Sequence, residues 1–259
     1  MIYRIKNCLT SERLRKKLVY QRLENINRLF TGLGLNSWEN SMLGKTLIFS
    51  GGKIDLEFAA EYLGAQKFDS IVCADSGLEA ARLLNQDVDF FMGDFDSVSD
   101  DTLKEFMKSK AEYIRYPEEK DETDTELVIN WVVENGATEI IILGATGGRL
   151  DHLLANINLL MIPLKKGVPA YIIDSNNKLC LIEKRHVFFR DKAFGKYVSF
   201  QPLTERVSNI YMTGFKYILE GEELCIGTSR AVSNEFDEKF SKAEISFDSG
   251  VLIAVESRD

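Results

Sequence analysis

Two aspartates carry the clearest chemical signal in this sequence, and they directly follow an apolar run that begins at Phe90. The run predicts a buried strand that ends at Gly93, and Asp94 and Asp96 come next. If the backbone stays extended, the two-residue period of a strand puts both carboxylates on one side. Carboxylates this close repel each other unless a proton or a divalent cation lies between them, and Mg²⁺ is commonly held by carboxylates and substrate phosphates. The pattern therefore indicates a metal site, although a turn in which Asp96 or Ser97 caps the next helix explains the same residues.

Three further polar clusters each follow a stretch that predicts a strand. In an open parallel sheet, ligands bind at the edge where the carboxyl ends of the strands meet. One such cluster is equally well explained as a turn, but four at one edge predict an active site. The three further clusters are the segments 75–77, 119–126 and 144–152.

The segment 119–126 combines a lysine with several carboxylates at the expected start of a helix. Asp121, Asp124 and Glu126 lie where the helix dipole favours negative charge, so capping alone explains part of this pattern. Capping does not explain Lys120, which supplies a point charge for a phosphate oxygen in a site of phosphates and metal.

The segment 144–152 is rich in glycine, so its backbone N–H groups can approach an anion at the start of the following helix. Arg149 can form a forked contact with a phosphate, and His152 either contacts a phosphate or base or only begins the helix. The sequence has no Gly-x-x-x-x-Gly-Lys-Ser/Thr loop. With only His152 and His186, it also shows no Ser-His-Asp or Cys-His arrangement. These residue types favour metal-assisted phosphate chemistry.

The elements that would position these clusters alternate regularly between residues 45 and 174. Short apolar strands that alternate with amphipathic helices predict a parallel sheet covered by helices on both faces, a Rossmann-like arrangement. The predicted strands are 46–50, 70–74, 89–92, 113–116, 139–143 and 170–173. The predicted helices are 55–66, 77–84, 100–108, 125–134 and 150–160.

The pattern changes after about residue 174, where short strand-like runs are separated by Gly, Asn and Asp turns. This predicts an antiparallel, β-sandwich-like domain, with the polar stretch 227–237 as a candidate binding loop. We therefore expect a basic extension over 1–42, a nucleotide-binding α/β catalytic domain over 43–174 and a β domain over 175–259. The predicted strands are 178–183, 186–189, 197–200, 209–212, 217–219, 243–247 and 251–255.

The charge of the chain is distributed unevenly. Residues 1–42 carry eight Lys or Arg and three Glu, so their net charge is +5. Because the whole chain has a net charge of −8, the remaining residues carry −13. An acidic main body argues against a nucleic-acid surface. Met42 stands just before the first predicted strand and is a candidate alternative start.

Two sequence features predict the compartment. The four cysteines lie far apart without a Cys-x-x-Cys pair, which indicates neither a zinc site nor a disulfide framework. We therefore expect the protein in a reducing cytoplasm. In addition, no apolar run approaches the length of a membrane span, so we expect no membrane partner.

Taken together, the motifs resemble those of the thiamine pyrophosphokinase family. The likeness extends over about residues 45–257 and includes a Ser-Asn-Glu segment at 233–235, whereas residues 1–42 have no counterpart. The four motifs are Ala-Asp-Ser-Gly at 74–77, Gly-Asp-Phe-Asp-Ser at 93–97, Lys-Asp-Glu-Thr-Asp-Thr-Glu at 120–126 and Gly-Gly-Arg-Leu-Asp-His at 147–152.

The resemblance implies an enzyme that transfers a pyrophosphoryl group from ATP, as co-substrate, to the hydroxyethyl oxygen of thiamine and releases AMP. It implies Mg²⁺ held by Asp75, Asp94, Asp96 and Asp124, with Asp121 or Asp124 as a candidate acceptor of the alcohol proton. In-line positioning and charge neutralisation are the main demands of such chemistry. The residues assigned to the nucleotide are Asp75, Gly77, Lys120, Thr123, Gly147, Gly148, Arg149, Asp151 and His152.

The same resemblance implies a homodimer with thiamine sites between the β domain of one subunit and the nucleotide domain of the other. Thiamine is a cation, so an acidic protein suits it. Ser233 and Asn234 would offer hydrogen bonds to its aminopyrimidine, and Thr228 and Ser229 would lie on the same loop. The aromatic partner of thiamine stays unassigned, since neither Trp38 nor Trp131 lies in the β domain.

Two other functions fit parts of the sequence. A phosphatase of the haloacid-dehalogenase type would use Asp94 as its nucleophile, because Asp94–Val98 also satisfies Asp-x-Asp-x-Thr/Val, but that motif usually follows the first strand. A non-catalytic thiamine or nucleotide sensor would keep the fold without turnover. The sensor would bind ATP or thiamine and release no AMP.

Overall fold

Strand β1 (Gly44–Phe49) lies inside a ten-stranded sheet because its residues are apolar on both faces. Leu47, Ile48 and Phe49 have no exposed surface, which is typical of a central parallel strand. The computed structural model describes residues 42–117 and 119–259, and residues 42–259 form one compact unit. The predicted basic extension lies outside the described residues, apart from Met42. Within the described part, no helix is long and apolar enough to cross a membrane.

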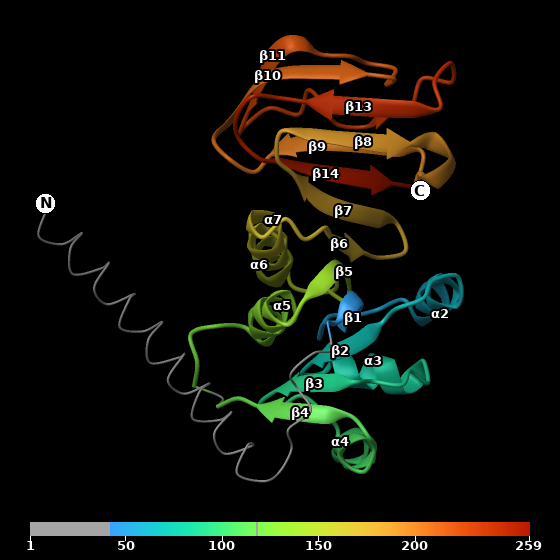
Figure 1. Cartoon of the computed structure of the whole chain (residues 1–259), viewed down its shortest axis with the longest axis vertical. Helices are drawn as coiled ribbons and strands as arrows, with labels where there is room; N and C mark the ends of the chain where they lie inside the picture. The colour runs from blue at the N-terminus through green and yellow to red at the C-terminus, as the bar shows by residue number, and fades with distance from the viewer. Residues whose placement is uncertain (1–41, 118) are drawn as a thin grey trace, which may run out of the picture. The chain divides into compact units, whose positions relative to one another are not determined.

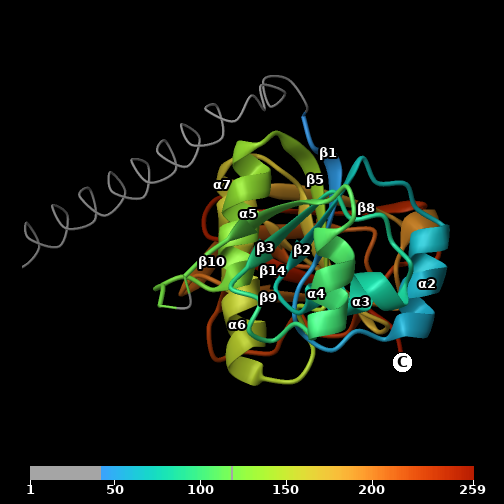
Figure 2. The same cartoon turned by 90° about the horizontal axis from the view of Figure 1, so that it is seen from below.

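The parallel half of the sheet has the order β6-β5-β1-β2-β3-β4. Figure 1 and Figure 2 show α2, α3 and α4 on one face of these strands and α5, α6 and α7 on the other. This confirms the predicted sheet with helices on both faces. The strands are β2 (Ser70–Ala74), β3 (Phe90–Gly93), β4 (Glu112–Arg115), β5 (Ala137–Leu143) and β6 (Ala170–Ile173); the helices are α2 (Leu56–Gly64), α3 (Gly77–Leu83), α4 (Asp100–Met107), α5 (Asp124–Glu134), α6 (Leu150–Leu159) and α7 (Met161–Lys165).

The antiparallel part begins at β7, which pairs with β6, so one sheet continues from the α/β half into the β half. A four-stranded sheet of order β11-β10-β13-β8 packs against this extension, and the core between the two sheets includes Phe200 and Ile245. The predicted β-sandwich-like fold is therefore confirmed, while the domain boundary at 174 stays a prediction. The remaining elements are β7 (Asn177–Ile182), β8 (Arg185–Phe189), a 3₁₀ turn η1 (Arg190–Lys192), β9 (Tyr197–Pro202), β10 (Arg206–Thr213), β11 (Glu220–Cys225), β12 (Asn234–Glu235), β13 (Lys242–Ser246) and β14 (Leu252–Ser257).

One strand expected from the sequence is absent, and one helix has a different end. The apolar run 217–219 is not a strand, because Tyr217 and Ile218 are exposed and only Leu219 is buried. The neighbouring strand is instead the polar β11, which is held by its backbone pairing with β10. The predicted helix 150–160 ends one residue early and is followed by the short helix α7, which tolerates Pro163 in its first turn.

The loops at the carboxyl edge of the sheet are packed backbone to backbone. Gly77 begins α3 directly over β1, and a Cβ atom at this position would lie 2.1 Å from the carbonyl oxygen of Phe49. The family resemblance assigns Gly77 to the nucleotide, and the structure gives it a packing role as well. The absence of a side chain here allows the loop after β2 to approach β1 closely.

Replacing this glycine should therefore strain the sheet edge. We expect Gly77→Ala to lower the free energy of unfolding by about 1–3 kcal/mol, as for other overpacked positions, in urea denaturation of the full chain. Gly64→Ala is the matched control, because nothing lies within 4 Å of its would-be Cβ and alanine favours a helix. Equal effects of the two substitutions would contradict this packing role.

Candidate active site

Three carboxylates meet at the carboxyl edge of the parallel sheet. Asp75 follows β2, and Asp94 and Asp96 follow the neighbouring strand β3. Each of the three offers an oxygen atom, and these atoms lie within 4.8 Å of one another. We call these three residues the acidic group. The sequence predicted that all three lie at this edge, and the family resemblance implied that they share a metal ion.

The backbone brings Asp94 and Asp96 together by a bend and not by an extended strand. Strand β3 ends at Gly93, and Phe95 has a left-handed φ of 66°. The Phe95 ring is buried 5.4 Å from that of Phe91, so core packing offsets the strain of this backbone conformation. The N–H group of Asp96 donates to Asp94 Oδ1 at 3.2 Å, which closes the bend. The side chains converge as expected, but for a different geometric reason.

Asp75 is under electrostatic stress. It also has a left-handed φ, of 45°, and its Oδ1 atom is buried without a hydrogen-bond partner among the described residues. Burial raises the pKa of this carboxyl, and the nearby charges of Asp124 and Asp94 raise it further, against the Ser76 N–H and the Ser97 hydroxyl that lower it. A proton or a bound cation would relieve this repulsion.

Lys120 lies between Asp94 and Asp124. Its Nζ atom is 2.9 Å from Asp94 Oδ2 and 2.9 Å from Asp124 Oδ1. The hydrogen bond from Lys120 is the main reason that the pKa of Asp94 lies below its usual range. Asp124 is the first residue of α5, and the N-cap of this helix is Thr123, whose hydroxyl accepts from the N–H of Glu126. The helix start is thus capped by a threonine, and the carboxylate of Asp124 faces the lysine.

A buried hydrogen bond fixes the start of α5 to the central strand. The hydroxyl groups of Ser50, after β1, and Thr125 are 2.7 Å apart. This contact holds the residue next to Asp124 against the sheet edge. Asp121 is exposed and lies outside the acidic group. Asp124, one of the two carboxylates considered for proton transfer, is held by Lys120 and by its place at the start of α5.

The donor set fits a divalent cation such as Mg²⁺. Hard oxygen ligands are present from three carboxylates, and the buried Asp75 Oδ1 has no other partner in the described part of the chain. The repulsion that raises the pKa of Asp75 is the kind that a bound cation removes. Asp124 is not part of the acidic group, because Lys120 lies between it and Asp94.

The strand order reverses between β1 and β5, and in open parallel sheets such a switch point is where ligands usually bind. The loops after these two strands touch, and the N–H of Gly52 donates to the Gly144 carbonyl at 2.9 Å. A Cβ at Gly147 would lie 2.5 Å from the Lys53 backbone, whereas Gly148 faces open space. Of the two glycines predicted to approach the nucleotide, Gly148 is therefore the one with an open side.

The loop at 50–53 was missed as a site element. The sequence signal is present, since Gly51 and Gly52 follow the first strand in the same way as the other clusters follow theirs. The segment has no carboxylate and no arginine, so its residue types indicate only a turn. In the structure it lies beside the predicted glycine-rich loop and presents an exposed cation, Lys53.

Arg149, Asp151 and His152 are exposed at the start of α6 and contact one another. Arg149 Nε donates to Asp151 Oδ1 at 3.1 Å, and the same oxygen accepts from the backbone N–H of His152 at 3.0 Å. The hydrogen bond from Arg149 is the main reason that the pKa of Asp151 lies below its usual range. These hydrogen bonds join the three residues to one another, so they form a second polar cluster at the same sheet edge.

The predicted substrate loop combines exposed and buried residues. Thr228, Ser229 and Ser233 are exposed, whereas the Asn234 side chain is buried. Asn234 accepts from the N–H of Tyr217 at 3.0 Å and donates to its carbonyl at 2.7 Å. Its side chain therefore fixes the backbone of an exposed tyrosine, a contact that sequence spacing did not reveal.

Ser233, on this loop, has a left-handed backbone conformation. Its φ is 57°, and its N–H donates to the Ser199 hydroxyl of β9 at 2.9 Å. The hydrogen bond offsets part of the cost of this backbone conformation. Ser233 therefore projects from the loop at a fixed point, whereas both polar atoms of the Asn234 side chain are used within the protein.

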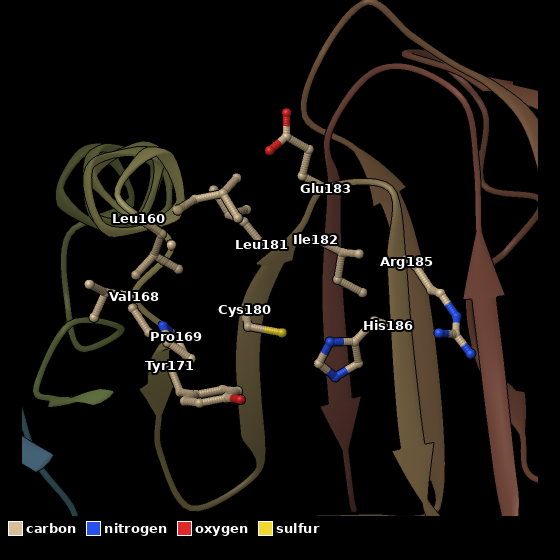
Figure 3. A pocket seen from close by; sticks show the side chains of 13 residues that line it. Leu160, Val168, Pro169, Tyr171, Cys180, Leu181, Ile182, Glu183, Arg185 and His186 are labelled. Atoms are coloured by element: carbon tan, nitrogen blue, oxygen red, sulfur yellow. The ribbon is translucent and has the colours of Figure 1, made fainter. Parts of the chain in front are cut away.

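A cavity of about 220 Å³ lies at the opposite edge of the sheet, near the amino end of β6, and is shown in Figure 3. It contains Tyr171, Cys180 and His186 and none of the predicted site residues. Burial raises the pKa of the Cys180 thiol to about 12 and lowers the pKa of His186. A thiol with a raised pKa is a poor nucleophile, so the shift of the Cys180 pKa gives no support to a Cys-His catalytic centre here.

Two family models match this chain. "Thiamin pyrophosphokinase, catalytic domain" matches residues 63–172, and "Thiamin pyrophosphokinase, vitamin B1 binding domain" matches residues 185–252. The thiamine pyrophosphokinase of Bacillus subtilis (strain 168) is 34% identical over 167 residues, which are 64% of this chain and 77% of that relative.

Solved structures show the same similarity. A crystal structure of thiamine pyrophosphokinase from Bacillus subtilis superposes with a TM-score of 0.74 and 28% identity, over 83% of this chain and 99% of that chain. The structure of thiamin pyrophosphokinase from Geobacillus thermodenitrificans gives a TM-score of 0.71 and 30% identity, over 83% of this chain and 98% of that chain.

The stress at Asp75 makes a prediction for metal-free protein. In a chelator, Asp75→Asn should raise the melting temperature above about pH 4, because asparagine removes a charge that the fold disfavours. The gain should vanish below the ordinary carboxyl pKa, where aspartate is protonated in both the folded and the unfolded state. Scanning calorimetry across pH 3–8 measures both effects.

If the acidic group holds a divalent cation, Mg²⁺ should raise the melting temperature of the unmodified chain, and the same variant should lose that gain. Asp87→Asn is the control for net charge, since Asp87 is exposed and precedes β3 at the opposite edge of the sheet. A lower melting temperature of Asp75→Asn in chelator at pH 7 would show that this carboxylate stabilises the empty fold, contrary to our account.

Proposed function

This chain belongs to the thiamin pyrophosphokinase family, and from that premise we propose how its acidic site performs the reaction. The resemblance predicted from the four motifs is confirmed, and so is the activity, that of a thiamine diphosphokinase. The thiamine hydroxyl attacks the β-phosphorus of ATP, the bond from this phosphorus to the oxygen of the α-phosphate breaks, and AMP leaves. The acidic group, in which the buried Asp75 Oδ1 has no hydrogen-bond partner among the residues that the structure describes, is the observation that carries our mechanism.

Asp75, Asp94 and Asp96 would hold Mg²⁺ beside the phosphates. When bound, the ion would neutralise charge on the phosphate oxygens and orient them. The protein's own contribution is position, since the bend at Phe95 and the contact of Gly93 with Asp75 hold the three carboxylates together. In-line geometry and charge neutralisation are sufficient for a loose phosphoryl-transfer transition state.

The nucleotide would bind at the switch point, over the loops that follow β1 and β5. Gly148 has an open side toward solvent, and the Arg149 guanidinium can exchange its contact with Asp151 for a phosphate. Lys53 lies on the adjoining loop and would add a second cation. The alcohol proton would pass to a site carboxylate, Asp121 or Asp124.

Thiamine would bind at the loop that presents Ser233. Tyr217 is 63% exposed, and Asn234 holds its backbone at both polar atoms. An exposed aromatic ring fixed in this way suits a cationic heteroaromatic ligand. We assign Tyr217 as the aromatic contact of thiamine, with Thr228, Ser229 and Ser233 as polar contacts. Asn234 would act through Tyr217.

We also propose that the enzyme is a homodimer with thiamine between the subunits. Leu150 and Leu154 lie one turn apart on α6 and are 74% and 62% exposed. Ile218 and Val232, near the proposed thiamine loop, are exposed too. Exposed apolar residues on both halves of the chain favour their burial against a second copy. The reducing cytoplasm that the cysteine spacing favoured stays a prediction.

The reaction is tested by its products. With ATP, Mg²⁺ and thiamine, we expect AMP and thiamine diphosphate in equal amounts by mass detection, and neither product without thiamine. Release of inorganic phosphate with a trapped phosphoryl group on Asp94 would instead support the phosphatase. Thiamine binding without AMP would support the sensor.

The metal assignment is tested at Asp96. Asp96→Asn should lower kcat about 100-fold or more, since a metal ligand contributes several kcal/mol of charge stabilisation. Asp101→Asn, at an exposed aspartate of α4, is the control and should be near wild type. Unchanged turnover of Asp96→Asn at saturating Mg²⁺ would remove Asp96 from the site.

The thiamine assignment is tested at Tyr217. Tyr217→Ala should raise the KM for thiamine about threefold to tenfold and leave the KM for ATP unchanged, because an aromatic contact to a cation is worth about 0.5–2 kcal/mol. Tyr217→Phe should behave like wild type. Tyr211→Ala, at another half-exposed tyrosine, controls for surface effects. An effect on ATP and not on thiamine would overturn the assignment.

A further inference from the structure

The Lys120 ammonium has an unusual position for a phosphate-binding group. It is 12% exposed and lies 2.9 Å from one oxygen each of Asp94 and Asp124, which are 13% and 23% exposed. A lysine whose only role is to bind a phosphate would be expected to point to solvent when the phosphate is absent. This one is already neutralised by two carboxylates of its own chain.

The two contacts define a cation position. Asp94 Oδ2 and Asp124 Oδ1 face a single point from strand β3 and from the start of α5. Asp124 Oδ1 is buried, and in the described part of the chain the Lys120 ammonium, 2.9 Å away, is the charge that compensates it. Without Lys120, the same oxygens would form a second site for a divalent ion next to the acidic group.

We propose that Lys120 is a positioning residue that permanently fills one of two adjacent cation positions in this site. The nucleotide-free protein would then bind a single divalent cation, at the acidic group, with Asp94 shared between that cation and the ammonium. Asp124 would be kept in place by the lysine and would not ligate this cation. The inference rests on the proposed function, because it divides the charges of the same site.

A fixed ammonium has a physical advantage over a second metal. It cannot dissociate, so Asp94 and Asp124 keep their separation when the nucleotide and its cation enter or leave. It also lowers the net negative charge that the polyphosphate meets. A purely structural ion pair would instead stabilise the fold and leave metal binding unchanged.

Metal stoichiometry separates these two roles. Mn²⁺ is titrated into the nucleotide-free full chain at about 0.15 M salt, and the free ion is followed by electron paramagnetic resonance. We expect one bound Mn²⁺ in wild type and two in Lys120→Met. Lys120→Arg should keep one, because arginine restores a fixed cation. One Mn²⁺ in Lys120→Met, or a wild-type number other than one, overturns the proposal.

The matched control is Lys45→Met. Lys45 is also partly buried and paired, 3.1 Å from Glu139, but it lies at the opposite end of β1. It should leave the stoichiometry at one, so a second Mn²⁺ in this variant as well would mean unspecific binding to an acidic protein and would contradict us. Should Lys120→Met fail to fold, Lys120→Gln, checked by its melting curve, makes the same charge change with a polar side chain and the same predicted number of ions.

A parallel product assay separates this inference from the proposed function. If wild type forms AMP and thiamine diphosphate but Lys120→Met still binds one Mn²⁺, the role of Lys120 is wrong and the function stands. If the stoichiometry rises from one to two but wild type makes no AMP, the function fails and the cation position stands.

Discussion

Repulsion among carboxylates is the constraint on which this active site depends. Asp75, Asp94 and Asp124 are close enough for the charges of the latter two to raise the pKa of the first. Such a group is unfavourable in an empty protein, and its members stay together only because the surrounding structure fixes them. Lys120 offsets part of the repulsion from within the chain, and the rest is available to attract a cation.

The sheet holds the carboxylates in place against their mutual repulsion. The carboxylates follow neighbouring parallel strands, whose hydrogen bonds fix their spacing, and the bends that aim them are anchored in the core, as the buried Phe95 ring shows. Close glycine contacts at Gly52, Gly77 and Gly147 leave little freedom for the loops to separate. Part of the stability of the fold is therefore used to hold an unfavourable arrangement of charges, as is common at catalytic sites.

Strand periodicity and strand order made much of this predictable from the sequence. Alternating apolar strands and amphipathic helices indicate the parallel sheet, and the rule that ligands bind at carboxyl strand ends predicts that Asp75 and Asp94 lie together. The bend at Phe95 was not predicted, because a left-handed phenylalanine depends on packing that sequence spacing does not encode. The prediction of a strand at 217–219 was wrong because its apolar residues are exposed, and sequence alone does not distinguish an exposed apolar run from a buried strand.

Long-range side-chain contacts were the least predictable part of the site. Asn234 and Tyr217 are 17 positions apart, and only the folded chain shows that the Asn234 side chain holds the backbone of Tyr217. Likewise, Lys120 and Asp94 are 26 positions apart, so the sequence suggested a phosphate contact where the structure has an ion pair. Residue type predicted the chemistry of these positions, and the fold decided the partners.

The central claim is that the acidic group holds a divalent cation at the sheet edge. Anomalous diffraction from crystals soaked in Mn²⁺ tests it most directly. We expect a strong anomalous peak within coordination distance of oxygens from Asp75, Asp94 and Asp96, in the absence of nucleotide. A protein that forms thiamine diphosphate but shows no peak among these three carboxylates, with or without ATP, would contradict the account.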